Sequence, residues 1–212
     1  AQGAKGDDSA FRAYTKMVFT QEVASNTVSL HYTLKNPEEY GIADAPVTFG
    51  SCLTEEEGIL VSVENMRGAL SDFSYDDLNV QNRLTYDVLE YYLDMLEADA
   101  QYLLYEEPLG LVSGIQTQLP ILLSEYQFYD EGDVNTYLEV MQSTPEYFDS
   151  LIAFEKQKSE EGLFMADYAA DTVIEQCNAF VEMGDGNYLI STFVERISEL
   201  DELTEKEKSD YI

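Results

Sequence analysis

Apolar residues recur at helical spacing along most of this chain, and this periodicity limits the folds it can adopt more than any other feature. The longest apolar stripe consists of Leu84, Val88, Tyr91, Tyr92, Met95 and Tyr102. Residues three, four or seven positions apart share one side of a helix. No segment alternates as a half-buried strand does, and the best β-like run, Val47–Phe49, is too short. The pattern predicts an all-α fold, a multi-helix array of antiparallel helix pairs.

Capping residues and helix breakers divide this pattern into separate helices. We expect helices over residues 9–25, 54–70, 74–105, 115–126, 130–142, 144–161, 167–183 and 187–200, and from 204 onward. Residues 28–42 should form an irregular or short helical link, because Pro and Gly interrupt them. Thr54 and Thr204 each stand three positions before a Glu, which predicts two capping boxes. Thr144 followed by Pro145 predicts a fresh helix start.

The two ends of the chain differ from the helical body between them. Residues 1–8 are small and polar, and we expect them to be a flexible lead-in to a helical domain over residues 9–212. Thr204, which opens the last capping box, is followed by only eight residues, and isolated helices that short are marginal. We therefore expect the domain to be truncated at its C-terminus, as part of a larger helical protein.

The chain is strongly acidic. Its 212 residues include 42 Asp and Glu but only 11 Lys and Arg, which gives a net charge of −31. Each bound phosphate normally requires a Lys or Arg, so this balance excludes nucleic acid and argues against an anionic membrane surface. No run reaches the roughly 18–20 apolar residues of a membrane span, so no transmembrane segment is expected. Hydrophobic residues still make up 45% of the chain, which favours a folded core.

A single histidine, His31, limits the catalytic chemistry available to the chain. A zinc site with two histidines cannot be built, and a catalytic triad would have to use His31 as its base. We interpret His31 instead as a structural histidine that bonds to the backbone near a helix end. Two carboxylates can also act as the acid and base of a glycosidase. However, 42 acidic residues place some pair at any separation, and Trp, which often stacks on sugars, is absent.

The acidic runs and the cysteines give no clear metal site. Asp130–Asp133 and Met183–Asn187 lack the alternating ligands and terminal Glu of a helix–loop–helix calcium site. We interpret Asp130 as a helix N-cap, with further acidic residues in the first turn. Cys52 and Cys177 match no metal-binding spacing, and spacing does not decide whether they form a disulfide. Cys177 lies among apolar residues of a predicted helix, which favours a buried thiol.

The segment Ser113–Tyr126 is the most unusual part of the sequence. Gly and polar side chains stand immediately before a short, strongly apolar helix. Free backbone N–H groups at such a helix start can hold an anion or a peptide carbonyl. Ser113, Gly114 and Gln116 are therefore candidate binding residues, and the alternative is a tight turn between two helices.

Several segments together resemble a bacterial family, the domain-of-unknown-function family 885. They are Ser29–Ile42, Ser113–Tyr126 with Phe128, Asp133–Leu138, Thr144–Phe148 and Phe154–Met165. The resemblance covers most of the chain after about Phe11. It implies an exported protein or a lipoprotein, located outside the cell or at its surface, with any lipid anchor upstream of residue 1.

The resemblance also implies a large, mostly helical protein similar to zinc metallopeptidases. The metal-binding His-Glu helix of such proteins lies C-terminal of the region that this chain resembles. No motif of that kind is present here, so the resemblance assigns no catalytic residue and no metal ligand to this chain. Zinc would belong to the missing C-terminal part. That part, and a peptide substrate, are the expected partners.

Two functional hypotheses follow. The first is a non-catalytic N-terminal region of an exported zinc-dependent peptidase, which forms a wall or lid of the substrate cleft. The second is a stand-alone acidic helical module that binds a protein or peptide in a groove. A detached region should expose a large apolar face, because such patches are uncommon on monomers. A self-sufficient module should have a closed core and one modest groove.

Overall fold

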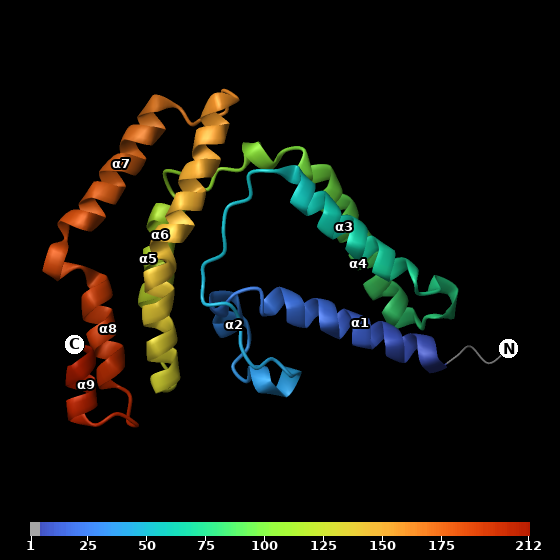
Figure 1. The fold of residues 1–212 in the computed structure, drawn as a ribbon, viewed down its shortest axis with the longest axis horizontal. Helices are drawn as coiled ribbons and strands as arrows, with labels where there is room; N and C mark the ends of the chain where they lie inside the picture. Colours follow the sequence, from blue (N-terminus) through green and yellow to red (C-terminus); the bar gives the residue numbers. More distant parts are fainter. Residues whose placement is uncertain (1–4) are drawn as a thin grey trace.

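The structure, a computed structural model, describes residues 5–212, and all regular secondary structure over that range is helical (Figure 1). Its α-helices are α1 (Lys5–Val23), α2 (Thr27–Thr33), α3 (Glu56–Ser71), α4 (Val80–Ala100), α5 (Ile115–Glu125), α6 (Glu131–Glu160), α7 (Asp167–Glu182), α8 (Tyr188–Ser198) and α9 (Glu205–Tyr211). Short 3-10 turns cover Pro37–Tyr40, Tyr75–Asp77, Leu103–Tyr105 and Gly184–Gly186. The predicted all-α class is confirmed. Within the described range, none of the helices combines the length and apolar character needed to cross a bilayer.

The N-terminal helices form one group. Helices α3 and α4 lie side by side, and α1 crosses one end of the pair (Figure 1). Their shared core consists of Phe11, Val63, Leu70, Leu78 and Leu93. Helix α1 begins at Lys5, four residues before the start expected at residue 9, and the first four residues of the expected lead-in lie outside the described residues. The Asp8 carboxylate accepts hydrogen bonds from the Asn79 N–H and the Asn82 amide.

The C-terminal helices form a second group around α6. Helices α5, α7 and α8 pack beside one another, and α9 closes one end (Figure 1). Tyr126, Tyr137 and Val140 anchor one core here, and Val134 and Ile197 anchor a second. Helix α2 connects the two groups, because its side chains contact α1 on one side and the segment around Tyr126 on the other.

Two predicted helix boundaries are wrong, the first because of a local side-chain cap and the second because of tertiary packing. The helix expected over residues 74–105 is broken, because the Asn79 side chain accepts a bond from the Asn82 N–H and so starts α4 at Val80. The helices expected over 130–142 and 144–161 are one helix of 30 residues, α6, with Pro145 inside it. Proline removes one backbone hydrogen bond. The buried residues Val140 and Leu151, on either side, hold the helix together despite this loss.

The predicted caps have mixed outcomes. The capping box at Thr204 is confirmed, with reciprocal bonds between Thr204 and Glu207 at the start of α9. The capping box at Thr54 is wrong, because α3 starts one residue later and its N-cap, Glu55, makes no side-chain cap bond. The N-cap at Asp130 is confirmed, since its carboxylate accepts from the Asp133 N–H at 3.1 Å.

The fold leaves much apolar surface in water. Its accessible surface is 13534 Å², whereas a compact monomer of 24.0 kDa is expected to have about 9,900 Å². Helix α4 shows why. One of its sides packs into the N-terminal core, while the other side, the α4 stripe, is exposed. We define the α4 stripe as Val80, Leu84, Val88, Tyr91, Tyr92 and Met95.

Candidate functional site

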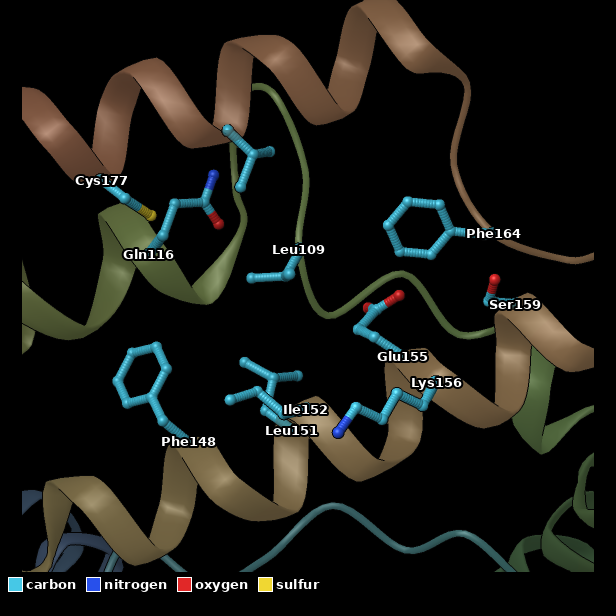
Figure 2. A pocket seen from close by; sticks show the side chains of 11 residues that line it. Leu109, Gln116, Phe148, Leu151, Ile152, Glu155, Lys156, Ser159, Phe164 and Cys177 are labelled. Atoms are coloured by element: carbon cyan, nitrogen blue, oxygen red, sulfur yellow. The ribbon is translucent and has the colours of Figure 1, made fainter.

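A groove runs between α5, α6 and α7 and contains an apolar pocket (Figure 2). The pocket has a volume of about 430 Å³. Its apolar walls are formed by Leu109, Phe148, Leu151, Ile152, Phe164 and Val173. Figure 2 shows that α6 forms the floor, with Phe148, Leu151 and Ile152 pointing upward, while Phe164 closes one side. Pockets of this size and apolar character are typical of small-molecule or side-chain binding.

A second pocket continues the groove. It has a volume of about 260 Å³ and shares Gln116, Phe148 and Cys177 with the first. Its remaining wall is apolar, with the exception of Thr144, whose buried hydroxyl has no hydrogen-bond partner. We call the two pockets together the α5–α6–α7 groove.

Gln116 is held in the groove wall by a small hydrogen-bond network. Its side-chain N–H donates to the Gly110 carbonyl at 2.6 Å and to the Gln176 side-chain oxygen at 2.8 Å. Gln176 in turn donates to the Leu111 carbonyl at 3.0 Å. The Oε1 atom of Gln116 is buried and has no hydrogen-bond partner. One end of this amide is therefore fully used, and the acceptor end is free.

Gly114 allows the loop before α5 to fold tightly around Gln116. A Cβ at Gly114 would lie 2.1 Å from Gln116 Oε1 and 2.3 Å from the Gly110 backbone nitrogen. Neither distance is sterically allowed, so only glycine fits between the loop and the amide. The first N–H of α5, from Ile115, already donates to the Pro108 carbonyl at 2.8 Å.

Glu155 lies on α6 in the wall of the first pocket and is only 8% exposed. Both of its carboxylate oxygens are buried without a hydrogen-bond partner. Burial raises the pKa of this carboxyl, and the nearby Lys158 charge only partly opposes the effect. Lys158 is itself fully buried, but it donates to the Glu106 carbonyl and pairs with the Glu107 carboxylate at 3.0 Å. Glu155 is thus a buried acid without a direct partner.

The structure separates the three candidate binding residues of the sequence. Gln116 lies in the wall of both pockets, and Gly114 is the N-cap of α5 that shapes the loop around it. Ser113 is exposed and does not line either pocket. Glu155, Thr144 and the wall residues of α6 were missed. The available signal for Glu155 was its position on the same side of the helix as Leu151 and Lys158, which places a charge within a buried stripe.

The cysteine prediction is partly wrong. Cys177 was expected to be buried, but it is exposed and lines the groove, where Figure 2 places its sulfur beside Gln116. The reason is that α7 turns only Val173 fully inward. Both Cys52 and Cys177 are free thiols.

A separate pocket, which is polar and has a volume of about 460 Å³, surrounds His31 in the last turn of α2. The imidazole stacks on the Tyr126 ring with centroids 3.8 Å apart, and its Nδ1 lies 3.5 Å from an Asp133 carboxylate oxygen. The expected backbone partner is therefore wrong, because the partner is a carboxylate. Burial acts to raise the pKa of Asp133, but the adjacent His31 imidazole and the hydrogen bond from the Tyr129 N–H outweigh it and lower the pKa.

The contacts around His31 are typical of a structural residue rather than of a nucleophilic site. The Tyr32 hydroxyl donates to the Leu122 carbonyl at 2.6 Å, and burial raises the pKa of this phenol to about 12. Among the described residues, no hydrogen bond joins His31 to a Ser, Thr or Cys side chain. Over the same residues, no three His, Cys, Asp or Glu side chains gather as a metal-binding group.

Comparison with known proteins identifies one family. The family model DUF885, described as a bacterial protein of unknown function, matches residues 56–211. The matched part includes the α5–α6–α7 groove and the α4 stripe, whereas Ser29–Ile42 and His31 lie outside it. Neither the curated proteins nor the solved structures provide a match.

Proposed function

The chain belongs to the DUF885 family of bacterial proteins, and from this premise we propose that it is a non-catalytic helical region of an exported, zinc-dependent peptidase. In this role it forms a wall or lid of the substrate cleft. The zinc would be held by another part of the protein, because residues 5–212 contain no group of side chains suited to hold it. The region would lie outside the cell or at its surface.

The observation that carries this proposal is the excess of accessible surface. The chain exposes about 3,600 Å² more than expected for a compact monomer of its mass. Permanent interfaces bury about 2,000–5,000 Å² in total. About half of that area, about 1,000–2,500 Å², comes from each partner, so the excess is more than large enough to supply this chain's share of one permanent interface.

The α4 stripe is the best candidate for that interface. Its six apolar side chains extend along almost the whole length of α4, and Leu84, Val88 and Tyr91 are each more than half exposed. A second copy of the chain is a poor occupant, because two bodies with a net charge of −31 repel each other. Further helices of the same protein are the occupant we propose.

The test compares this chain with a protein that carries the sequence following Ile212. The double substitution Leu84→Glu and Val88→Glu should leave the unfolding midpoint of residues 1–212 nearly unchanged, since both side chains are in water. In the longer protein the same substitutions should lower the midpoint. Val112→Glu is the control, because Val112 is 85% exposed and lies outside the α4 stripe. An equal response of both proteins would reject the interface.

Catalysis gives the second arm of the test. Residues 1–212 alone should not hydrolyse peptides, whereas the longer protein should do so in a chelator-sensitive manner. Chelator-insensitive cleavage by residues 1–212, abolished by replacing one of their own side chains, would overturn the proposal.

The alternative is a stand-alone acidic helical module that binds a protein or peptide. The α5–α6–α7 groove favours this alternative, because it combines apolar walls with unpartnered acceptors. If the Glu substitutions in the α4 stripe have no effect in the longer protein, and the groove still binds peptide, the alternative replaces the first proposal.

A further inference from the structure

We propose that the α5–α6–α7 groove binds an organic cation with an apolar body, in which a primary ammonium group pairs with Glu155. This site is separate from the interface proposed above, because it lies between α5, α6 and α7 rather than on α4. The proposal therefore stands or falls independently of the role of the α4 stripe.

The first argument is the unpartnered state of Glu155. A buried carboxylate without a hydrogen bond or counter-ion is costly, so such groups are normally paired. Lys158 does not fill this role, because its ammonium is directed to the Glu106 carbonyl and the Glu107 carboxylate. Lys156 also lines the pocket, but it is exposed and forms no ion pair with Glu155 in the described part of the chain. A cation entering the pocket would supply the missing partner.

The second argument is that the free polar atoms are acceptors. Gln116 is also only 8% exposed, and its Oε1 lacks a donor in the same pocket wall. Two walls of one pocket, from α5 and from α6, thus offer buried oxygen atoms without a donor, whereas the donors that line the pocket, Lys156 and Ser159, are exposed. A ligand that donates hydrogen bonds would satisfy these buried oxygens, and an anion would not. The net charge of −31 favours cations further.

The third argument is the shape and character of the remaining wall. Phe148, Leu151 and Val173 line the same pocket as Glu155, and the groove continues into the second pocket past Met141 and Leu189. An ammonium alone would be better solvated in water. An ammonium on an aliphatic or arylalkyl body gains from burying that body, at about 25 cal/mol per Å² of apolar surface. The site therefore selects a ligand that combines an ammonium group with an apolar body.

This arrangement also predicts a pH dependence of binding. The charged groups around Glu155 are Lys156 and Lys158 on α6 and Glu107 before α5. The nearby thiols are Cys177, which lines the pocket from α7, and Cys52, whose pKa is raised by burial and further by the Glu155 charge. Ammonium binding requires ionised Glu155, whose pKa is raised by burial. Binding should therefore weaken as the pH falls through that raised pKa.

The test uses 4-phenylbutylamine and its neutral analogue 4-phenylbutanol as probes. Calorimetric titration at pH 7 and 0.15 M salt should give at least tenfold tighter binding of the amine. Glu155→Gln should weaken amine binding at least tenfold and leave alcohol binding within twofold. Glu139→Gln is the matched control, because Glu139 is an exposed acid on the same helix and its loss changes the net charge equally.

A second variant protects the test against a folding defect. Phe164 is 45% exposed, so Phe164→Ala should leave the fold intact while removing part of the pocket wall. It should weaken the amine and the alcohol by the same factor. Equal affinities for amine and alcohol in the wild-type protein, or equal effects of Glu155→Gln and Glu139→Gln, would overturn the proposal.

The source of such a cation is either a free amine or the lysine side chain of a peptide. A blocked tripeptide, Phe-Lys-Leu, distinguishes these two sources. Binding that depends on Glu155, and is lost when norleucine replaces the lysine, identifies a lysine side chain of a peptide as the ligand. Binding of the amine but not of the tripeptide identifies a free amine. Failure of both probes to bind rejects the site altogether.

Discussion

Asp133 near the start of α6 and Glu155 near its end are both withdrawn from water, yet their surroundings differ. Asp133 accepts a hydrogen bond from the Tyr129 N–H and lies 3.5 Å from the His31 imidazole, and its pKa is lowered. Glu155 has no hydrogen-bond donor within reach, and its pKa is raised. The carboxylate at the first end stabilises the fold. The carboxylate at the second end is a cost to the fold, and groups retained at such a cost often have a function.

The largest expected effect on the free energy of unfolding is near the start of α6, in the packing around His31. Tyr126 is 1% exposed and stacks on His31, so Tyr126→Ala should lower the free energy of unfolding by about 3–5 kcal/mol. Urea titration measures this loss. Tyr129→Ala is the control, because Tyr129 also lies beside His31 but is 55% exposed. A similar loss for both variants would show that the packing around His31 is not a structural core.

The next effect concerns the loop that positions Gln116. Gly114→Ala would place a methyl group against Gln116 Oε1 and the Gly110 nitrogen, and should destabilise by about 1–3 kcal/mol. Gly58→Ala, within α3, meets no atom within 4 Å and should instead stabilise by about 0.5–1 kcal/mol. The midpoints of thermal unfolding should therefore move in opposite directions. A neutral Gly114→Ala would mean that the loop does not fit tightly around the amide.

Asp133→Asn tests the satisfied carboxylate. It should lower the free energy of unfolding at pH 7 by about 1–2 kcal/mol, because the bond to His31 is weakened. Because the folded-state pKa of Asp133 is lowered, ionised Asp133 stabilises the protein above its unfolded pKa of about 3.9. This stabilisation is lost as the pH falls through the folded pKa. Denaturant titrations at pH 7 and pH 3 should show the difference between variant and wild type shrinking.

Glu155→Met tests the opposite case and should stabilise the protein at pH 7 by about 1 kcal/mol, because it removes a buried, unsatisfied acid. Since the folded-state pKa of Glu155 is raised, its ionisation is a cost above that pKa. The cost disappears as the pH falls below the unfolded value of about 4.3. The gain should therefore be larger at pH 7 than at pH 4. Destabilisation at both pH values would show that Glu155 is satisfied after all.

The sequence predicts those parts of the fold that depend on local chemistry. The Thr204 capping box, the Asp130 cap and the extent of α7 all follow from residues within one helical turn. The buried side of α4 could not be predicted in the same way. Two sides of α4 are apolar, and periodicity alone does not say which of them packs against α1 and α3. Pro145 misled for a related reason, because packing on both sides outweighs one lost hydrogen bond.

The candidate site shows the same division. Gln116 is predictable because Gly and polar residues before an apolar helix form a local pattern. Glu155 is only partly predictable. Its helical position places it in a buried stripe, but it is one of 42 acidic residues, and only the three-dimensional structure shows that its oxygens lack partners. The pairing of His31 with Asp133 joins residues about 100 positions apart, and no spacing rule connects them.

Pro145 lies between the two ends of α6 and has a consequence for how the helix opens. Because proline has no amide hydrogen, the ladder of exchangeable protons is interrupted near the middle of this helix. Fluctuations that begin there need not spread in both directions. Deuterium should therefore enter the segments of α6 before and after Pro145 as two separate blocks. The block before Pro145, which packs near Tyr126, should stay protected for longer than the block after it, which contains Glu155.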